Sequence, residues 1–263
     1  MQTARRSRHS GFTIVELLIA AAITVVIVVL LGTMFGFLTG TTSRASQRID
    51  AFRDARAAVQ LMERDLSCLV RAQPTAYFAL DKIWQDTGAD SYSDPASSGP
   101  NRQLFVLVAA KNPGVGDLCA VGYYCRWDSA KHCYSLYRYF SDSTATFSAL
   151  QANVPGVYAA AAILFKPKVT DNLLASYVWN FQVAAYKPDC TVDSTYPLVI
   201  NPSNPAVVLP ATLEVSFTAM SPSAGRAIMS ISNTPSDWMD STKPNYQRLI
   251  LPNSYEFRTR ITL

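Results

Sequence analysis

The stretch RRSRHSGFTIVELLIAAAITVVIVVLLG, residues 5–32, joins a basic segment to a long apolar run. Three arginines precede an apolar run from Phe12 to Leu38 that contains a single charged residue, Glu16. A bilayer core needs about 20 apolar residues, so the 27 residues of this run are long enough to cross one. A carboxylate inside a membrane span costs free energy and usually marks a partner. The run therefore predicts a membrane helix with one acidic residue that needs a partner.

The flanks of the run predict an anchor with a defined orientation. The run is longer than the roughly 7–15 apolar residues of a secretory signal, and no A-x-A site follows it. The arginines ahead of the run place the N-terminus in the cytoplasm by the positive-inside rule, with the body of the chain across the membrane. We therefore expect a single-pass membrane protein.

The composition of the remaining chain predicts a β-rich, nearly neutral body. Of the 23 basic residues, three precede Gly11, which leaves 20 basic against 19 acidic residues. This balance predicts no nucleic-acid-binding surface. The 15 prolines and 13 tyrosines favour strands and loops over a helical bundle.

The segment after the apolar run predicts a continuation of the same helix. No proline occurs between Phe12 and Pro74, so we expect one helix from about Phe12 to Gln73, amphipathic over residues 39–73. Its apolar stripe consists of Ile49, Phe52, Val59, Met62, Leu66 and Leu69. A coiled-coil partner is one interpretation of this stripe. The other is packing against the β-rich remainder, which needs a layer to cover its sheet.

Seven later segments predict strands. They are residues 104–110, 120–127, 133–140, 160–165, 177–186, 211–218 and 257–263. The second and third form a predicted hairpin around residues 128–131. We expect loops at 81–102, 187–210 and 221–256, with a short helix near Asp237. Together these elements predict an α+β fold.

The motif GFTIVE, residues 11–16, resembles the type III signal of type IV prepilins and type II secretion pseudopilins. In that family a prepilin peptidase cleaves after the glycine and methylates the new terminal amine. The resemblance implies that residues 1–11 are a leader, that cleavage follows Gly11, and that Phe12 becomes the methylated terminus. It also implies that Glu16 pairs in the membrane with the Phe12 amine of a neighbouring subunit, which offsets the cost of burying both charges.

Later stretches resemble, in their order, the J-type minor pseudopilins (the PulJ/GspJ-like group). They are RIDAFRDARAAVQLMERDL at 48–66, LYRYF at 136–140, VWNFQVAAY at 178–186 and LPATLEVSFTAM at 209–220. FRDARAAV and LEVSFTAM are more similar still to the Verru/Chthon cassette protein C group of prepilin-like proteins. Residues 81–102 and 221–256 look like additions to the J-type pattern.

The resemblance implies a pilin-like fold, in which a long N-terminal helix packs on an antiparallel β-sheet head. The transmembrane part would be residues 12–38, and the head would be residues 74–263. The implied function is that of a minor pseudopilin, a structural subunit of a type II secretion pseudopilus or a type IV pilus-like filament. The implied partners are prepilin peptidase, other pilins and pseudopilins, an assembly platform and the bacterial inner membrane, with the head in the periplasm.

Two other classes of function stay open from the sequence. One is a membrane-anchored minor pilin that acts as a binding module in adhesion or DNA uptake, although the near-neutral head shows no basic cluster. The other is an anchored hydrolase, but of the two histidines His9 lies in the leader and His132 in the hairpin. No phosphate loop, dinucleotide fingerprint or zinc spacing occurs. We expect no catalytic residue, no metal and no cofactor; the spacing of the aspartates in 81–102 does not match a calcium loop.

Three glycines follow one another at a spacing of four, at Gly32, Gly36 and Gly40. On a helix this spacing makes a face of small residues that lets another helix approach closely. The alternative is that the glycines only soften the helix, at about 1 kcal/mol each relative to alanine.

Five cysteines suit a head outside the cytoplasm, where disulfides persist. The candidates for a disulfide are Cys119, Cys125, Cys133 and Cys190, and the odd number leaves at least one thiol over. Cys68, alone on the helix, is the candidate for the unpaired one. The alternative is that all five are small buried apolar residues.

Overall fold

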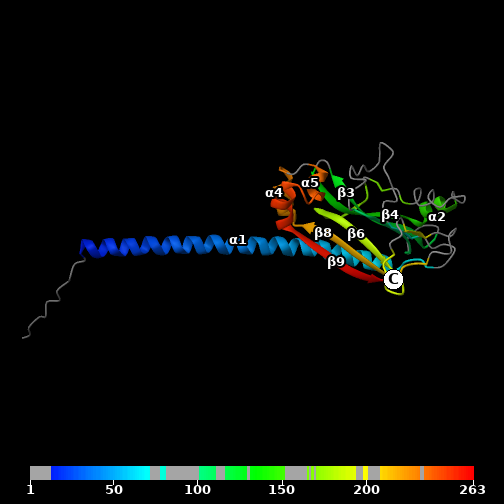
Figure 1. Ribbon diagram of the computed structural model, residues 1–263, viewed down its shortest axis with the longest axis horizontal. Helices are drawn as coiled ribbons and strands as arrows, with labels where there is room; N and C mark the ends of the chain where they lie inside the picture. The colour runs from blue at the N-terminus through cyan, green and yellow to red at the C-terminus, as the bar shows by residue number, and fades with distance from the viewer. Residues whose placement is uncertain are drawn as a thin grey trace, which may run out of the picture. The chain divides into compact units, whose positions relative to one another are not determined.

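The computed structural model describes most of the chain and divides it into two compact units, Met1–Ser46 and Gln47–Leu263. One helix, α1 (Ile14–Ser67), contributes to both units (Figure 1). The described residues are 13–71, 78–80, 101–110, 116–128, 131–151, 165, 167–168, 170–193, 198–200, 208–231 and 234–263. The fold is α+β, with an apolar N-terminal helix and antiparallel sheets, as predicted.

Helix α1 is uninterrupted over 54 residues, as the absence of proline predicted, but it ends at Ser67 rather than near Gln73. Its last turn tightens, because the amides of Cys68 and Leu69 donate to the carbonyls three residues earlier at 3.1 Å. The next amide, Val70 N–H, donates to Leu107 O at 3.0 Å, and Leu69 forms a bridge with Val108. Pairing with the sheet therefore replaces the helix at this point.

Two antiparallel sheets form the second unit. The larger has the order β5-β4-β3-β2-β1-β7 and the smaller the order β6-β8-β9. The larger sheet contains β1 (Phe78–Leu80), β2 (Gln103–Ala109), β3 (Leu118–Asp128), β4 (Cys133–Ser141), β5 (Asn172–Ser176) and β7 (Leu198–Ile200). The smaller contains β6 (Val178–Tyr186), β8 (Thr212–Met220) and β9 (Ser254–Thr262).

Six of the seven predicted strands are confirmed, as β2, β3, β4, β6, β8 and β9. The predicted hairpin is β3–β4, with Asp128 opposite Cys133 and Trp127 in edge contact with Tyr134 at 5.0 Å. The seventh segment, 160–165, lies outside the described residues except for Phe165, which is buried and belongs to no strand. Similarly, only residues 101 and 102 of the predicted loop 81–102 are described.

The prediction of loops at 187–210 and 221–256 was wrong in part. The first segment contains β7, and the second contains α4 (Pro222–Met229), α5 (Pro235–Met239), η1 (Tyr246–Ile250) and η2 (Leu251–Asn253). The α4 start is readable in the sequence, because Ser221 caps Ala224 N–H at 3.2 Å and Pro222 stands at the first helical position. The short helix near Asp237 is α5. Helix α2 (Ser143–Gln151) and the strands β1, β5 and β7 were not predicted.

From Phe52 onward, the apolar stripe of α1 packs on the head of its own chain, whereas Ile49, which was predicted to belong to it, is exposed. Ala55, Ala58, Met62 and Leu66 are buried in the main core together with residues of both sheets. Nearer the N-terminus of α1, the centroid of the Phe52 ring lies 4.6 Å from the ring centroid of Phe257 in β9. Figure 1 shows β9 beside this part of α1. The two alanines let the helix approach closely, and the stripe therefore covers the sheets rather than a coiled-coil partner.

A second core lies on the opposite face of the larger sheet. It contains Phe105, Tyr124, Tyr137, Tyr139 and Phe165. Phe105 stacks on Phe165 at 4.6 Å and stands directly opposite Gly122 of β3. A Cβ at Gly122 would lie 2.1 Å from the Phe105 ring, so this strand position has room only for glycine.

One buried polar cluster joins α1 to the larger sheet. Asp65 of α1 accepts a hydrogen bond from the Tyr123 hydroxyl of β3 at 2.5 Å and one from Arg138 Nε of β4 at 2.6 Å. Tyr123 and Arg138 are directly opposite each other in the ladder. Burial raises the pKa of Tyr123, with the Asp65 charge as the second cause, so its hydroxyl stays protonated and donates. The cluster fixes the helix in one register on the sheet.

Asp65→Asn should lower the free energy of unfolding by about 3–5 kcal/mol, because it leaves the Arg138 guanidinium in the interior without a counter-charge. Urea unfolding of the purified full chain in detergent measures the change. Arg53→Gln is the matched surface control, since it breaks an exposed pair with Asp54 (3.4 Å). It should change the free energy of unfolding by less than about 1 kcal/mol.

The double variant Asp65→Leu/Arg138→Met separates charge from packing. It should lose less stability than Asp65→Asn, because neither partner is then left as an unpaired charge. An equal or larger loss in the double variant would show that the charge of Asp65 does not hold the helix in place.

Candidate functional site

The start of α1 is built by a reciprocal pair of side chains, Thr13 and Glu16. The Thr13 backbone N–H and its hydroxyl both donate to Glu16 Oε2, at 2.9 and 3.0 Å. In return, the Glu16 N–H donates to Thr13 Oγ1 at 3.3 Å. This is a capping box, in which two amides that a helix leaves unpaired at its start find acceptors. The sequence reasoning missed it, although the spacing T-x-x-E in TIVE is its signature.

The capping box leaves part of the Glu16 carboxylate open. Oε2 accepts both of these hydrogen bonds, and among the described residues Oε1 accepts none. A carboxylate accepts up to about four hydrogen bonds, so an additional donor can bind without breaking the cap. The residues immediately ahead, Gly11 and Phe12, are outside the described residues.

The apolar part of α1 satisfies its own polar groups. Residues Ile14–Leu38 are long and apolar enough to cross a membrane, and none of the side chains is buried within the chain. The hydroxyls of Thr24, Thr33 and Thr42 donate to the carbonyls of Ala20, Leu30 and Leu38 at 2.8–3.0 Å. A surface without unpaired donors is what a hydrocarbon environment requires.

The face formed by Gly32, Gly36 and Gly40 is open. A Cβ built at any of the three would meet no atom within 4 Å, so none of the described residues fills the space. The exposed neighbours are large, such as Phe35 and Phe37. The glycines therefore form a shallow strip along an otherwise bulky helix surface, of the kind that admits a second helix.

The structure forms no disulfide among the five cysteines. Cys125 stands opposite Leu136, and Cys133 opposite Asp128, three ladder positions away. Three residues along a strand span about 10 Å, which exceeds the roughly 4.4–6.8 Å between the Cα atoms of a disulfide. Both side chains are nevertheless buried in the main core. Burial raises the pKa of Cys133, so its thiol is protonated and a poor nucleophile. The Cys68 and Cys190 side chains are exposed.

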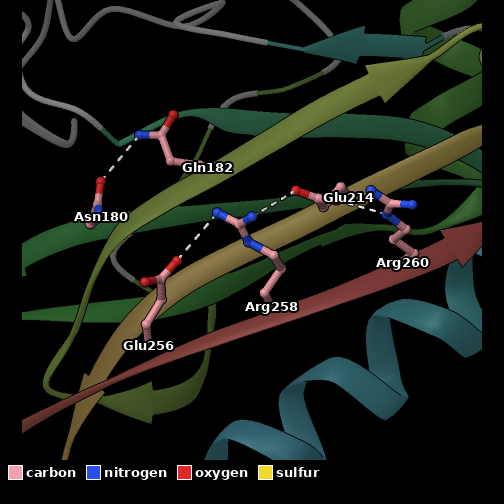
Figure 2. Close-up of polar contacts among 6 residues, drawn as sticks. All are labelled: Asn180, Gln182, Glu214, Glu256, Arg258 and Arg260. Atoms are coloured by element: carbon pink, nitrogen blue, oxygen red, sulfur yellow. Dashed lines mark hydrogen bonds and ion pairs between the residues drawn. The ribbon is translucent and has the colours of Figure 1, made fainter. Parts of the chain in front are cut away.

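The outer face of the smaller sheet is polar (Figure 2). Glu214 of β8 lies between two arginines of β9, at 2.8 Å from Arg260 Nε and 3.5 Å from Arg258. Arg258 also reaches Glu256 at 3.5 Å. Two carboxylates thus balance two guanidiniums, and exposed pairs of this kind contribute at most about 1 kcal/mol each. On this face the four charged side chains shown in Figure 2 are therefore balanced in charge.

The described part of the chain contains no group of three His, Cys, Asp or Glu side chains that could hold a metal ion. His132 lies in the β3–β4 turn with a left-handed backbone (φ 45°).

A tyrosine–aspartate hydrogen bond ties β3 to the segment before β5, since the Tyr124 hydroxyl donates to Asp171 at 2.7 Å. Burial raises the pKa of Asp171, whose carboxylate also accepts the Lys168 N–H at 2.9 Å. These contacts hold the fold together.

Comparison with known proteins locates one motif. Residues 6–32 match the family model described as the prokaryotic N-terminal methylation motif. A search of curated proteins finds no match. A solved structure of a type IV-like pilin from Thermus thermophilus is similar at 12% identity over 80% of this chain and 95% of its own, with a TM-score of 0.38. The chain thus carries the N-terminal methylation motif of prokaryotic pilins and pseudopilins.

Proposed function

We propose that the chain is a prepilin-like minor pseudopilin, a structural subunit of a type II secretion pseudopilus or a type IV pilus-like filament. The observation that carries the proposal is the methylation motif at residues 6–32, followed without a break by a helix that runs into the head. In this proposal residues 1–11 are the leader and residues 12–38 cross the inner membrane. The remainder of α1 carries a periplasmic head, which includes residues 74–263.

Processing would create the partner that Glu16 needs. Cleavage after Gly11 makes Phe12 the terminal residue, whose amine the peptidase then methylates. This amine carries a positive charge, and Glu16 lies four residues further along the chain. Before assembly the carboxylate caps Thr13 of its own chain. In the filament it would also accept a hydrogen bond from the Phe12 amine of a neighbouring subunit, through Oε1.

Assembly in the membrane would use the exposed part of α1. The apolar side chains of Ile14–Leu38 face lipid in the single subunit, and the glycine strip offers another helix a close approach. The proposed partners are other pilins or pseudopilins, an assembly platform and prepilin peptidase. The role is structural, and the head presents surfaces to neighbouring subunits.

Mass spectrometry of the protein from its native host should show an N-methylated Phe12 terminus. Gly11→Val should leave the leader attached, because a branched side chain replaces the residue at the cleaved bond. The membrane fraction is the material to use, and Gly32→Val is the control, since it lies beyond the leader. An intact Met1 terminus on wild-type protein in assembled filaments would contradict the proposal.

Glu16→Gln separates the charge of the carboxylate from its capping role. Glutamine at this position still accepts from the Thr13 N–H, as in a capping box, but it cannot pair with an amine as an anion. We expect near-normal leader cleavage and at least a tenfold loss of co-purification with tagged partner prepilins, the order expected for one charge-assisted hydrogen bond of about 1.5–3 kcal/mol. Glu16→Val should behave similarly, and Glu16→Asp should be intermediate.

Thr13→Val is the matched control for the capping box. It removes the hydroxyl partner of Glu16 but keeps the carboxylate, so assembly should stay close to that of the wild type. If Glu16→Gln assembles normally while Thr13→Val fails, the carboxylate serves the helix start alone and its proposed role between subunits is wrong.

A further inference from the structure

The strand β5 is an edge of the larger sheet. It pairs with β4 on one side, and among the described residues no strand lies on its other side. The outward N–H and C=O groups of an edge strand are a template for another strand. The side chain of Leu173 on this edge is 45% exposed, which is unusual for a large aliphatic residue in a sheet.

A groove runs along this edge. It encloses about 460 Å³ and is lined by β5 from Leu173 to Ser176, by Tyr177, and by Pro222, Arg226 and Met229 of α4. This volume is within the usual range of ligand clefts, roughly 300–1,000 Å³. A Cβ at Gly225 would lie 2.2 Å from the Tyr177 ring, so α4 rests directly on that ring. The position of α4 opposite β5 is therefore fixed by packing, and the groove is preformed.

The charges that line the groove are not balanced. Asp54 of α1 is near Arg53 Nε at 3.4 Å, and Lys131 of the β3–β4 turn is near Asp128 at 3.4 Å. Arg226 is exposed and makes no ion pair with any described residue. The excess charge beside the free strand edge is therefore positive, and it is a guanidinium, the group best suited to bind a carboxylate.

We propose that this groove binds an extended, acidic segment of another protein, which adds to β5 as a further strand. The backbone of the segment pairs with the free edge of β5, and its apolar side chains contact Leu173 and Met229. A carboxylate of the segment pairs with Arg226. Main-chain hydrogen bonds supply affinity in this mode of recognition, while the alternate side chains supply specificity. Binding needs neither leader cleavage nor filament assembly, so the proposal can fail while the proposed function stands.

A fluorescein-labelled peptide of sequence TVEVTVE tests the groove, with the full chain in detergent micelles and fluorescence anisotropy as the measurement. We expect saturable binding that weakens as salt is added, since exposed charges are screened. The matched peptide TVKVTVK should bind at least about tenfold more weakly, the order of one charged hydrogen bond. A TVEVTVE peptide with N-methylated backbone amides should not bind, because it cannot pair with a strand edge.

Two variants of the chain locate the binding. Arg226→Glu should weaken the TVEVTVE peptide at least about tenfold, the loss of one charge-assisted contact. Arg248→Glu, an equal charge change at another exposed arginine in η1, should leave it unchanged. Equal thermal unfolding of both variants and the wild type shows that the head is intact. Hydrogen exchange at the amides of residues 173–176 should slow when the TVEVTVE peptide binds.

Several outcomes would overturn the proposal. These are the absence of binding at millimolar peptide, equal binding of the acidic and basic peptides, equal binding of the N-methylated peptide, and equal effects of Arg226→Glu and Arg248→Glu. Self-association of the chain that Arg226→Glu abolishes, without binding of the TVEVTVE peptide, would assign the groove to a second copy instead.

Discussion

The second half of α1 packs onto both sheets, and this contact holds the head together. Met62 and Leu66 are fully buried in the main core, and burial of such side chains contributes about 1.5–3 kcal/mol each. Apolar packing alone allows a helix to slide by a turn, since its stripe repeats. Asp65 removes that freedom, because Tyr123 and Arg138 can reach its carboxylate in one register only.

The two ends of α1 differ in which side chains they bury and which they expose. In the head, α1 buries small residues such as Ala55 and Ala58 and hides one charge in a closed cluster. At its start it exposes large apolar side chains, and the Glu16 carboxylate is held by a cap through Oε2, while Oε1 accepts no hydrogen bond from the described residues. Because α1 contains no proline, it continues without a break from the exposed apolar part into the part that is buried in the head.

The sequence predicted the long helix, its apolar span and six strands, because these depend on local patterns such as the stripe of Met62 and Leu66. It predicted neither β5 nor β7, which are short and acquire their pairing from neighbours far along the chain. It also missed the role of Asp65, since only the fold brings Tyr123 and Arg138 to it, 58 and 73 residues away. Sequence also could not show which of the candidate cysteines meet, because the register of β3 and β4, which keeps Cys125 and Cys133 three residues apart, follows from the fold.

The capping box lowers the free energy that is needed to place the Glu16 carboxylate in a membrane. A bare carboxylate in lipid would be expensive, and any partner would then be strongly favoured. Here the Thr13 amide and hydroxyl already hold Oε2, so the single subunit keeps the charge partly compensated. Pairing with a neighbour then adds contacts at Oε1 to a charge that is already held in position. In our proposal the capping box lowers the free-energy cost of holding the Glu16 carboxylate in the membrane before assembly. Assembly then gains the smaller free energy of one additional charge-assisted hydrogen bond, which makes the pairing reversible.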